Sequence, residues 1–168
     1  VGIFDWIEGS SITTINQNDI NLCLNFLKSL NDIKSEPQFT NLQCAASACL
    51  SGSDIECQID DRLKILLNSS VNSPDLNFFL KNKFIPRSKE ILNWSKQNWP
   101  DDIRFEKRIP RTQQILSPSD FGFHNAIRRT NGSLAFLDFE YFGWDDPVKL
   151  ICDFTFHPGM NLTDEQIK

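Results

Sequence analysis

Residues 117–140 read SPSDFGFHNAIRRTNGSLAFLDFE, and this stretch decides the expected fold. Asn131-Gly132 lies between two apolar runs, which strongly indicates a β-hairpin, because a type I′ turn requires positive φ at both central residues. With these two residues as the turn, Asn125 falls directly opposite Asp138. Side chains directly opposed on one sheet face have Cβ atoms about 4.5–5.5 Å apart. The sequence therefore predicts that this amide and this carboxylate meet.

Glu140 continues the same alternation and is expected on the same face as Asp138. One amide oxygen and two carboxylates form an oxygen-rich site of the kind that Mg²⁺ prefers. Asp120 stands just before the hairpin. Each residue also has a simpler explanation: a loop-capping Asp120, a strand-edge Asn125 and an exposed strand end at Asp138. The joint spacing favours a magnesium site of Asn125, Asp138 and Glu140 beside Asp120.

Length and composition indicate one soluble globular domain. The chain has 168 residues, of which 40% are apolar, enough for one sizeable core. A net charge of −5 argues against a nucleic-acid or membrane-surface partner, because phosphate-rich surfaces select basic proteins. No apolar run reaches the roughly 18 residues of a membrane span, and no charged-then-apolar leader is visible. We therefore expect a cytoplasmic protein whose partner is neither a nucleic acid nor a membrane.

Five cysteines are present, an odd number without a C-x-x-C pair. Their apolar surroundings favour reduced, buried thiols, as in cytosolic proteins. A zinc site of Cys44, Cys49 and Cys57 is an alternative, although the spacing is not that of known zinc motifs.

Apolar periodicity predicts a mostly helical chain with a small β insert, an α+β fold. Pro86 interrupts the longest pattern, which indicates two helices or a kink. Both ends of the sequence look like cuts through a larger protein. The expected elements are a strand at 1–7, helices at 18–30, 42–50, 53–67 and 74–94, a strand from 114, a helix at 147–156 and the start of another at 163.

Several co-ordered motifs resemble a known family. Residues 120–125 read DFGFHN, residues 137–147 read LDFEYFGWDDP, and Asp153 follows six residues later. Together they resemble the catalytic and metal loops of the aminoglycoside phosphotransferase and choline kinase-like family, which shares the protein-kinase-like fold. Residues 4–9, FDWIEG, look like that family's hinge strand, whose backbone receives adenine.

This resemblance implies the C-terminal lobe of a protein-kinase-like fold, mainly helical, with the hairpin carrying both loops. Residues 1–9 would be the hinge strand and 10–168 the helical lobe, with the catalytic loop at 117–125 and the metal loop at 137–144. The family's N-terminal lobe is absent from this sequence. The implied activity is Mg²⁺-dependent transfer of the γ-phosphoryl group of ATP or GTP to a hydroxyl of an aminoglycoside, a choline-like amino alcohol or a sugar.

The resemblance also assigns roles to individual residues. Asp120 would be the general base, and Asn125 with Asp138 would hold Mg²⁺. Glu140 would bind a second ion or the substrate. The remaining implied sites are a nucleotide hinge at Asp5, Trp6 and Ile7, a substrate pocket at Glu140, Tyr141 and Trp144, and structural support from His124 and Asp153.

One position departs from the family pattern. Pro118 stands two residues before Asp120, where the family usually has a histidine that supports the loop. A non-catalytic kinase-like binding module is therefore the alternative function. A helical interaction domain with an incidental hairpin is a third interpretation. Strand alternation turns His124 away from Asn125, which favours a structural role for His124.

Overall fold

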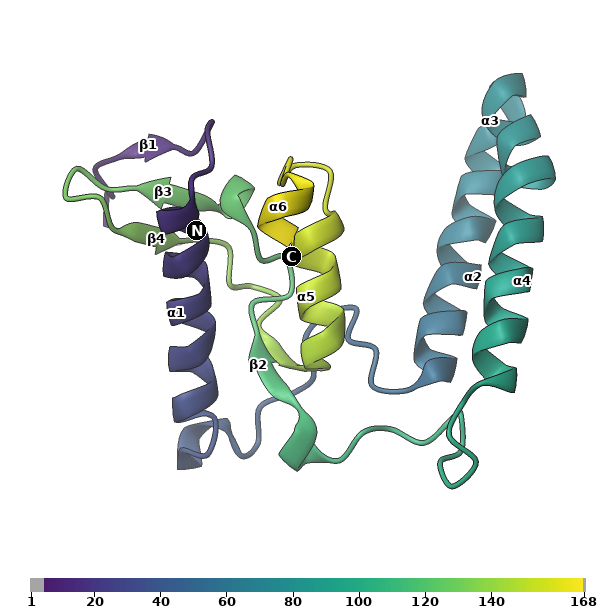
Figure 1. Ribbon diagram of the computed structural model, residues 1–168, viewed down its shortest axis with the longest axis horizontal. Coiled ribbons are helices and arrows are strands. Elements are labelled where there is room, and N and C mark those ends of the chain that lie inside the picture. The colour runs from purple at the N-terminus through teal and green to yellow at the C-terminus, as the bar shows by residue number, and fades with distance from the viewer. Residues whose placement is uncertain (1–4, 168) are drawn as a thin grey trace. The chain divides into compact units, whose positions relative to one another are not determined.

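The computed structural model describes residues 5–167, and they form two compact units (Figure 1). Unit 1 contains residues 5–48 and 110–167, and unit 2 contains residues 49–109. The expected organisation, a hinge strand at 1–9 followed by one helical lobe at 10–168, stays a prediction. Helices combine with small antiparallel sheets, which confirms the α+β class.

Unit 1 begins with a long helix, α1, from Gln17 to Ile33. Its N-cap is Asn16, whose side chain accepts a hydrogen bond from the backbone of Asp19, while the Asp19 side chain accepts one from the backbone of Asn16. This reciprocal capping satisfies two backbone donors, and it places the start one residue before the predicted one.

Two small antiparallel sheets complete the β structure of unit 1. In the first, β3 (Ala126–Arg128) lies between β1 (Ser10–Ser11) and β4 (Leu134–Phe136). In the second, β2 (Ile115–Ser117) pairs with β5 (Gly143–Asp145). The predicted hairpin is thus present as β3 and β4.

The predicted strand at 1–7 is wrong where the structure describes it. Residues 5–9 belong to no strand, and residues 1–4 lie outside the described residues. The strand forms later, at Ser10–Ser11, opposite Arg128 and Ile127. A Cβ at Gly9 would lie 2.4 Å from the carbonyl oxygen of Arg128, so only glycine permits this approach.

The last helices of unit 1 are α5 (Pro147–Phe156) and α6 (Asp164–Ile167), as the sequence predicts. Asp146 is the N-cap of α5, with proline at the first helical position. At the start of α6, Thr163 and Gln166 exchange side-chain to backbone hydrogen bonds.

The core of unit 1 is built on residues next to the predicted catalytic residue. Phe121 and Phe123 are buried, and Phe121 packs against Phe26 of α1 and Phe154 of α5. Gly122 stands between them in the sequence. The buried core cluster consists of Ile20, Cys23, Phe121, Phe123, Leu150 and Met160.

An ion pair that the sequence did not reveal joins α1 to the hairpin. Arg128 donates two hydrogen bonds to the fully buried carboxylate of Asp19, one of them at 2.9 Å. The hydrogen bond from Arg128 lowers the pKa of Asp19, against the opposing effect of burial. The carboxylate therefore stays charged inside the unit.

Unit 2 is a helical hairpin. Its first helix, α2, spans Gly52–Ser69 with Ser51 as N-cap. The second begins as α3 (Pro74–Phe79), passes through a π-helical turn at Leu80–Phe84 and continues as α4 (Ile85–Gln97). This interruption confirms the one predicted at Pro86, whose missing N–H breaks the regular hydrogen-bond ladder.

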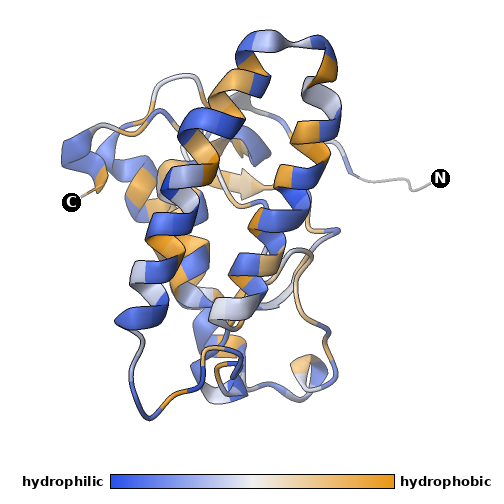
Figure 2. Cartoon of the chain, turned by 90° about the vertical axis from the view of Figure 1, so that its right-hand side faces the viewer, coloured by the Kyte–Doolittle hydropathy of each residue, from blue (hydrophilic) through white to orange (hydrophobic). Residues whose placement is uncertain are grey.

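Apolar residues lie on solvent-exposed turns of both long helices of unit 2 (Figure 2). A cavity of about 330 Å³ opens between α2 and α4, and its lining includes Ile59, Ile91, Trp99 and Phe105. None of the predicted site residues lines it. Across residues 5–167, no helix combines the length and apolar character that a membrane crossing requires.

The predicted helix at 42–50 is wrong. Residues 42–48 have no helix, and Cys44 forms an isolated parallel bridge with Trp144 instead. The backbones come so close that a Cβ at Gly143 would lie 2.4 Å from the nitrogen of Ala45. The small residues here serve backbone packing rather than a helix face.

The cysteines are free thiols, but only Cys23 and Cys49 are buried. Cys44, Cys57 and Cys152 are exposed, so the expectation of generally buried thiols is wrong for them. In the described part of the chain, no group of potential metal ligands includes a cysteine.

Candidate functional site

The hairpin differs from its prediction by one residue of register. The Gly132 N–H donates to the Arg129 carbonyl and the Arg129 N–H donates to the Ser133 carbonyl, both at 2.9 Å. The loop therefore has three residues, a type I turn followed by Gly132 at φ 83°. The side chain of Asn131 accepts from the Ser133 backbone at 3.0 Å, which favours this turn over a type I′ turn.

The altered register separates the pair that the sequence placed face to face. Ala126 is opposite Phe136, so Asn125 is opposite Leu137, whose N–H donates to the Asn125 carbonyl at 2.8 Å. The predicted opposition of Asn125 and Asp138 is wrong. Strand β4 ends at Phe136, and Asp138 adopts a positive φ of 61°.

Asn125 instead meets Asp120. Its side-chain nitrogen Nδ2 donates to the backbone carbonyl of Asp120 at 2.9 Å and to the carboxylate oxygen Oδ2 at 3.1 Å. The chain from Phe123 to Asn125 is a 3₁₀ turn, not a strand. This turn folds position 125 back onto position 120, five residues earlier. Neither bond uses the amide oxygen Oδ1, the atom that would ligate a cation.

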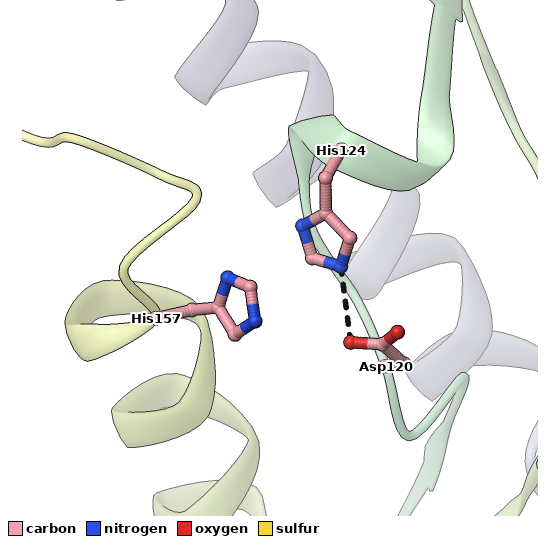
Figure 3. A group of neighbouring side chains, drawn as sticks. All are labelled: Asp120, His124 and His157. Carbon is pink, nitrogen blue, oxygen red and sulfur yellow. Dashed lines mark hydrogen bonds and ion pairs between the residues drawn. The ribbon is translucent and has the colours of Figure 1, made fainter.

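His124 also reaches Asp120, because residues 123–125 form a 3₁₀ turn and not the strand whose alternation was expected to turn His124 away from Asn125. Its Nε2 lies 3.0 Å from the carboxylate oxygen Oδ1 (Figure 3). A carboxylate only accepts hydrogen bonds, so Nε2 carries the proton. The expected supporting role of His124 stays a prediction, and this contact gives it a definite partner.

His157 lies on the other side of the same group, from the end of α5 (Figure 3). Its ring stacks on that of His124, with centroids 4.4 Å apart and planes at 19°. The N–H of Gly159 donates to its Nδ1 at 3.1 Å, which leaves the proton of the neutral imidazole on Nε2. From the sequence, the helix was expected to end at residue 156, and His157 was given no role in the site.

These neighbours set the charge state of Asp120. Partial burial acts to raise the pKa of Asp120, but the hydrogen bonds from His124 and Asn125 outweigh it and lower the pKa. The side chain is half exposed. Asp120 is thus an ionised, accessible carboxylate, suited to accept a hydrogen bond from an incoming hydroxyl.

The 137–144 loop adds negative charge. Asp138, Glu140 and Tyr141 are exposed. A hydrogen bond to Glu140 and the charge of Glu140 raise the pKa of Tyr141, with further contributions from the charges of Asp138 and Asp120. Carboxylates of both the 117–125 loop and the 137–144 loop therefore contribute to the raised pKa of Tyr141. Among the described residues, Asp138 and Glu140 belong to no group of three potential metal ligands, so the expected Mg²⁺ site stays a prediction.

Trp144 and Asp153 are placed differently from their predictions. Trp144 is buried, its Nε1 donates to the Phe39 carbonyl at 3.2 Å, and Arg111 covers its ring. It is a core residue and not a pocket wall. Asp153 accepts a hydrogen bond from Lys149, one turn earlier on α5, at 2.6 Å and does not brace the 117–125 loop.

The predicted nucleotide hinge falls on irregular chain. Asp5 is exposed, Trp6 is 85% exposed and Ile7 is half-buried. None of the three lies in a strand, so their expected contact with a nucleotide stays a prediction.

Asp120, His124 and His157 form the one group of three potential metal ligands found within residues 5–167, with ligand atoms inside 4.8 Å of one another. Two imidazoles suit zinc or a similar transition metal better than Mg²⁺. Both rings present N–H groups rather than lone pairs at Nε2, as the bonds above require. The group is therefore arranged to donate hydrogen bonds, not to bind a cation.

Comparison of the chain with models of protein families, with curated proteins and with solved structures gives no match.

Proposed function

We propose that this chain is the substrate-side lobe of a small-molecule kinase that transfers the γ-phosphoryl group of ATP or GTP to a hydroxyl. The acceptor would be an aminoglycoside, a choline-like amino alcohol or a sugar. One observation carries the proposal: Asp120 and Asn125 meet through a short turn, with two hydrogen bonds from the Asn125 amide to Asp120.

Phosphoryl transfer needs alignment and charge neutralisation more than a strong base. A carboxylate with a lowered pKa is a weak base, but it is ionised at neutral pH and orients a hydroxyl well. Asp120 has these properties, and its side chain is half exposed. In this proposal Asp120 accepts the hydrogen bond of the acceptor hydroxyl and directs its oxygen toward the phosphorus.

Mg²⁺ would be held by the amide oxygen of Asn125 and the carboxylates of Asp138 and Glu140. When bound, the ion would neutralise negative charge on the phosphates. All three donors are oxygens, and Asp138 and Glu140 are exposed. Glu140 alternatively contacts a cationic acceptor, in which case its hydrogen bond with Tyr141 shapes the acceptor side of the site.

The test is thermal unfolding of the protein with ATP, with and without Mg²⁺. We expect Mg²⁺-ATP to raise the unfolding temperature, and Asp138→Asn to abolish the rise because it removes a charged ligand. Asp153→Asn is the matched control, since Asp153 lies on α5 and pairs with Lys149. Stabilisation of equal size in the Asp138→Asn variant would contradict the proposal.

The second candidate is a non-catalytic kinase-like binding module, which the buried Pro118 favours. Pro118 has no side-chain donor to support Asp120. Absence of stabilisation by any nucleotide, with the fold intact, would favour the module.

A further inference from the structure

Two histidines lie stacked beside Asp120: His124, for which the sequence indicated only general structural support, and His157, which no motif assigned. We propose that His124 and His157 form a positioning pair that fixes the direction of the Asp120 carboxylate toward the acceptor. This inference rests on the proposed phosphotransfer function.

The carboxylate is held at both of its oxygens. His124 donates to Oδ1 at 3.0 Å, and Asn125 donates to Oδ2 at 3.1 Å. Each carboxylate oxygen accepts two hydrogen bonds, so each retains one lone pair for the acceptor. With both oxygens engaged, the carboxylate plane cannot rotate without breaking a bond. Pro118 supplies no donor, so both hydrogen bonds to the carboxylate come from the end of the 117–125 loop, from His124 and Asn125.

His157 is held in turn by the chain that follows α5. The N–H of Met160 donates to the His157 carbonyl at 2.9 Å, which closes a turn. The buried sulfur of Met160 accepts from the N–H of Phe123 at 3.2 Å. This contact attaches the 157–160 turn to the loop that carries His124, so the stacked rings belong to one packed assembly.

Two glycines leave room for the rings. A Cβ at Gly122 would lie 2.6 Å from Cε1 of His124, and a Cβ at Gly159 would lie 3.1 Å from Nδ1 of His157. Any side chain at position 122 would push the His124 ring away from Asp120. The absence of side chains at Gly122 and Gly159 therefore makes the space that the two imidazole rings fill.

A metal site built from the same three side chains is disfavoured by proton positions. Ligation through Nε2 of His157 requires the proton on Nδ1, where Gly159 already donates a hydrogen bond. Ligation through Nε2 of His124 requires loss of the proton that it gives to Asp120. Two existing hydrogen bonds would be lost, whereas the positioning role uses both.

The experiment measures Mg²⁺-ATP hydrolysis by the complete encoded protein, with water as the acceptor. His124→Ala should lower kcat by roughly 10- to 100-fold, the usual effect of a small misplacement of a reacting group, with little change in KM for Mg²⁺-ATP. His124→Gln retains an amide N–H near the position of Nε2 and should restore most of kcat. His124→Asn places its amide at the Nδ1 position and should not.

A second pair of variants tests the stack. His157→Phe keeps a flat ring and should preserve kcat, whereas His157→Ala should lower it. Long-range ¹H–¹⁵N spectra of the imidazoles provide a readout independent of turnover. They should show His124 protonated on Nε2 and should change at His124 in Asp120→Ala.

The outcomes separate this inference from the proposed function. Equal kcat for wild type and folded His124→Ala, or equal loss in the Gln and Ala variants, overturns the positioning pair while phosphotransfer stands. If the wild type neither hydrolyses ATP nor is stabilised by it, the proposed function fails. The spectra then still decide the geometry, because unchanged His124 resonances in Asp120→Ala would refute the contact.

Discussion

The ion pair between Asp19 and Arg128 gives the sharpest stability prediction. Asp19 is fully buried, whereas the Arg128 side chain is 28% exposed. Arg128→Ala leaves a buried carboxylate whose remaining hydrogen bond comes from the Asn16 backbone. Removing one partner of a buried pair costs about 3–5 kcal/mol, so we expect a loss of this size in the free energy of unfolding. Exposed Arg129→Ala, next in sequence, should change it by less than about 0.5 kcal/mol.

A second substitution should recover part of the lost stability. Asp19→Asn introduced into Arg128→Ala removes the stranded charge and keeps an oxygen for the helix cap, so stability should rise again. The assay is urea unfolding followed by Trp144 fluorescence, with the other three tryptophans replaced by phenylalanine. A loss below about 1 kcal/mol, as for an exposed pair, would refute the reasoning, as would a further loss in the double variant.

The same pair predicts a pH dependence with a definite sign. The folded-state pKa of Asp19 is lowered, chiefly by the hydrogen bond from Arg128. The stabilising contribution is therefore complete above the unfolded pKa of about 3.9 and is lost as pH falls through the folded pKa. The stability difference between wild type and Arg128→Ala should shrink below about pH 4.

Three further substitutions and one cysteine-modification experiment have expected outcomes. Gly143→Ala should prevent folding of unit 1, because the new Cβ would overlap neighbouring backbone. Gly132→Ala, whose Cβ would meet nothing within 4 Å, should lower the free energy of unfolding by only about 1 kcal/mol because of the positive φ at this position. Both variants are measured by urea unfolding. Asp146→Ala should cost about 1 kcal/mol through loss of the α5 cap, measured in the same way. Burial raises the pKa of Cys23 to about 12, so at pH 8 iodoacetamide should modify the exposed Cys57 and spare Cys23 until the protein unfolds, as mass spectrometry of peptides would show.

Local chemistry made several elements predictable. The helix at Pro147–Phe156, its acidic cap and its end at His157-Pro158 follow from residues within one turn of each boundary. The break before Pro86 follows from a missing N–H. By contrast, the prediction of a helix at 42–50 failed. This segment pairs with β5, which lies about 100 residues away in the sequence and gives no local signal.

The candidate site divides in the same way. The residues 120, 125 and 138 were identified by type and spacing, but the contact that links 120 with 125 arises from a 3₁₀ turn and not from the hairpin register. A single extra loop residue was enough to change the register, since side chains alternate with period two.

The sequence by itself determined most of the helices, the presence of the hairpin and the identity of the polar residues, because capping, turn and periodicity signals act over a few residues. Only the tertiary structure decided that His157 stacks on His124 and that Arg128 neutralises Asp19. Both contacts depend on how α5 and α1 pack on the buried rings of Phe121 and Phe123. That packing is a property of the assembled core, which no short stretch of chain specifies alone.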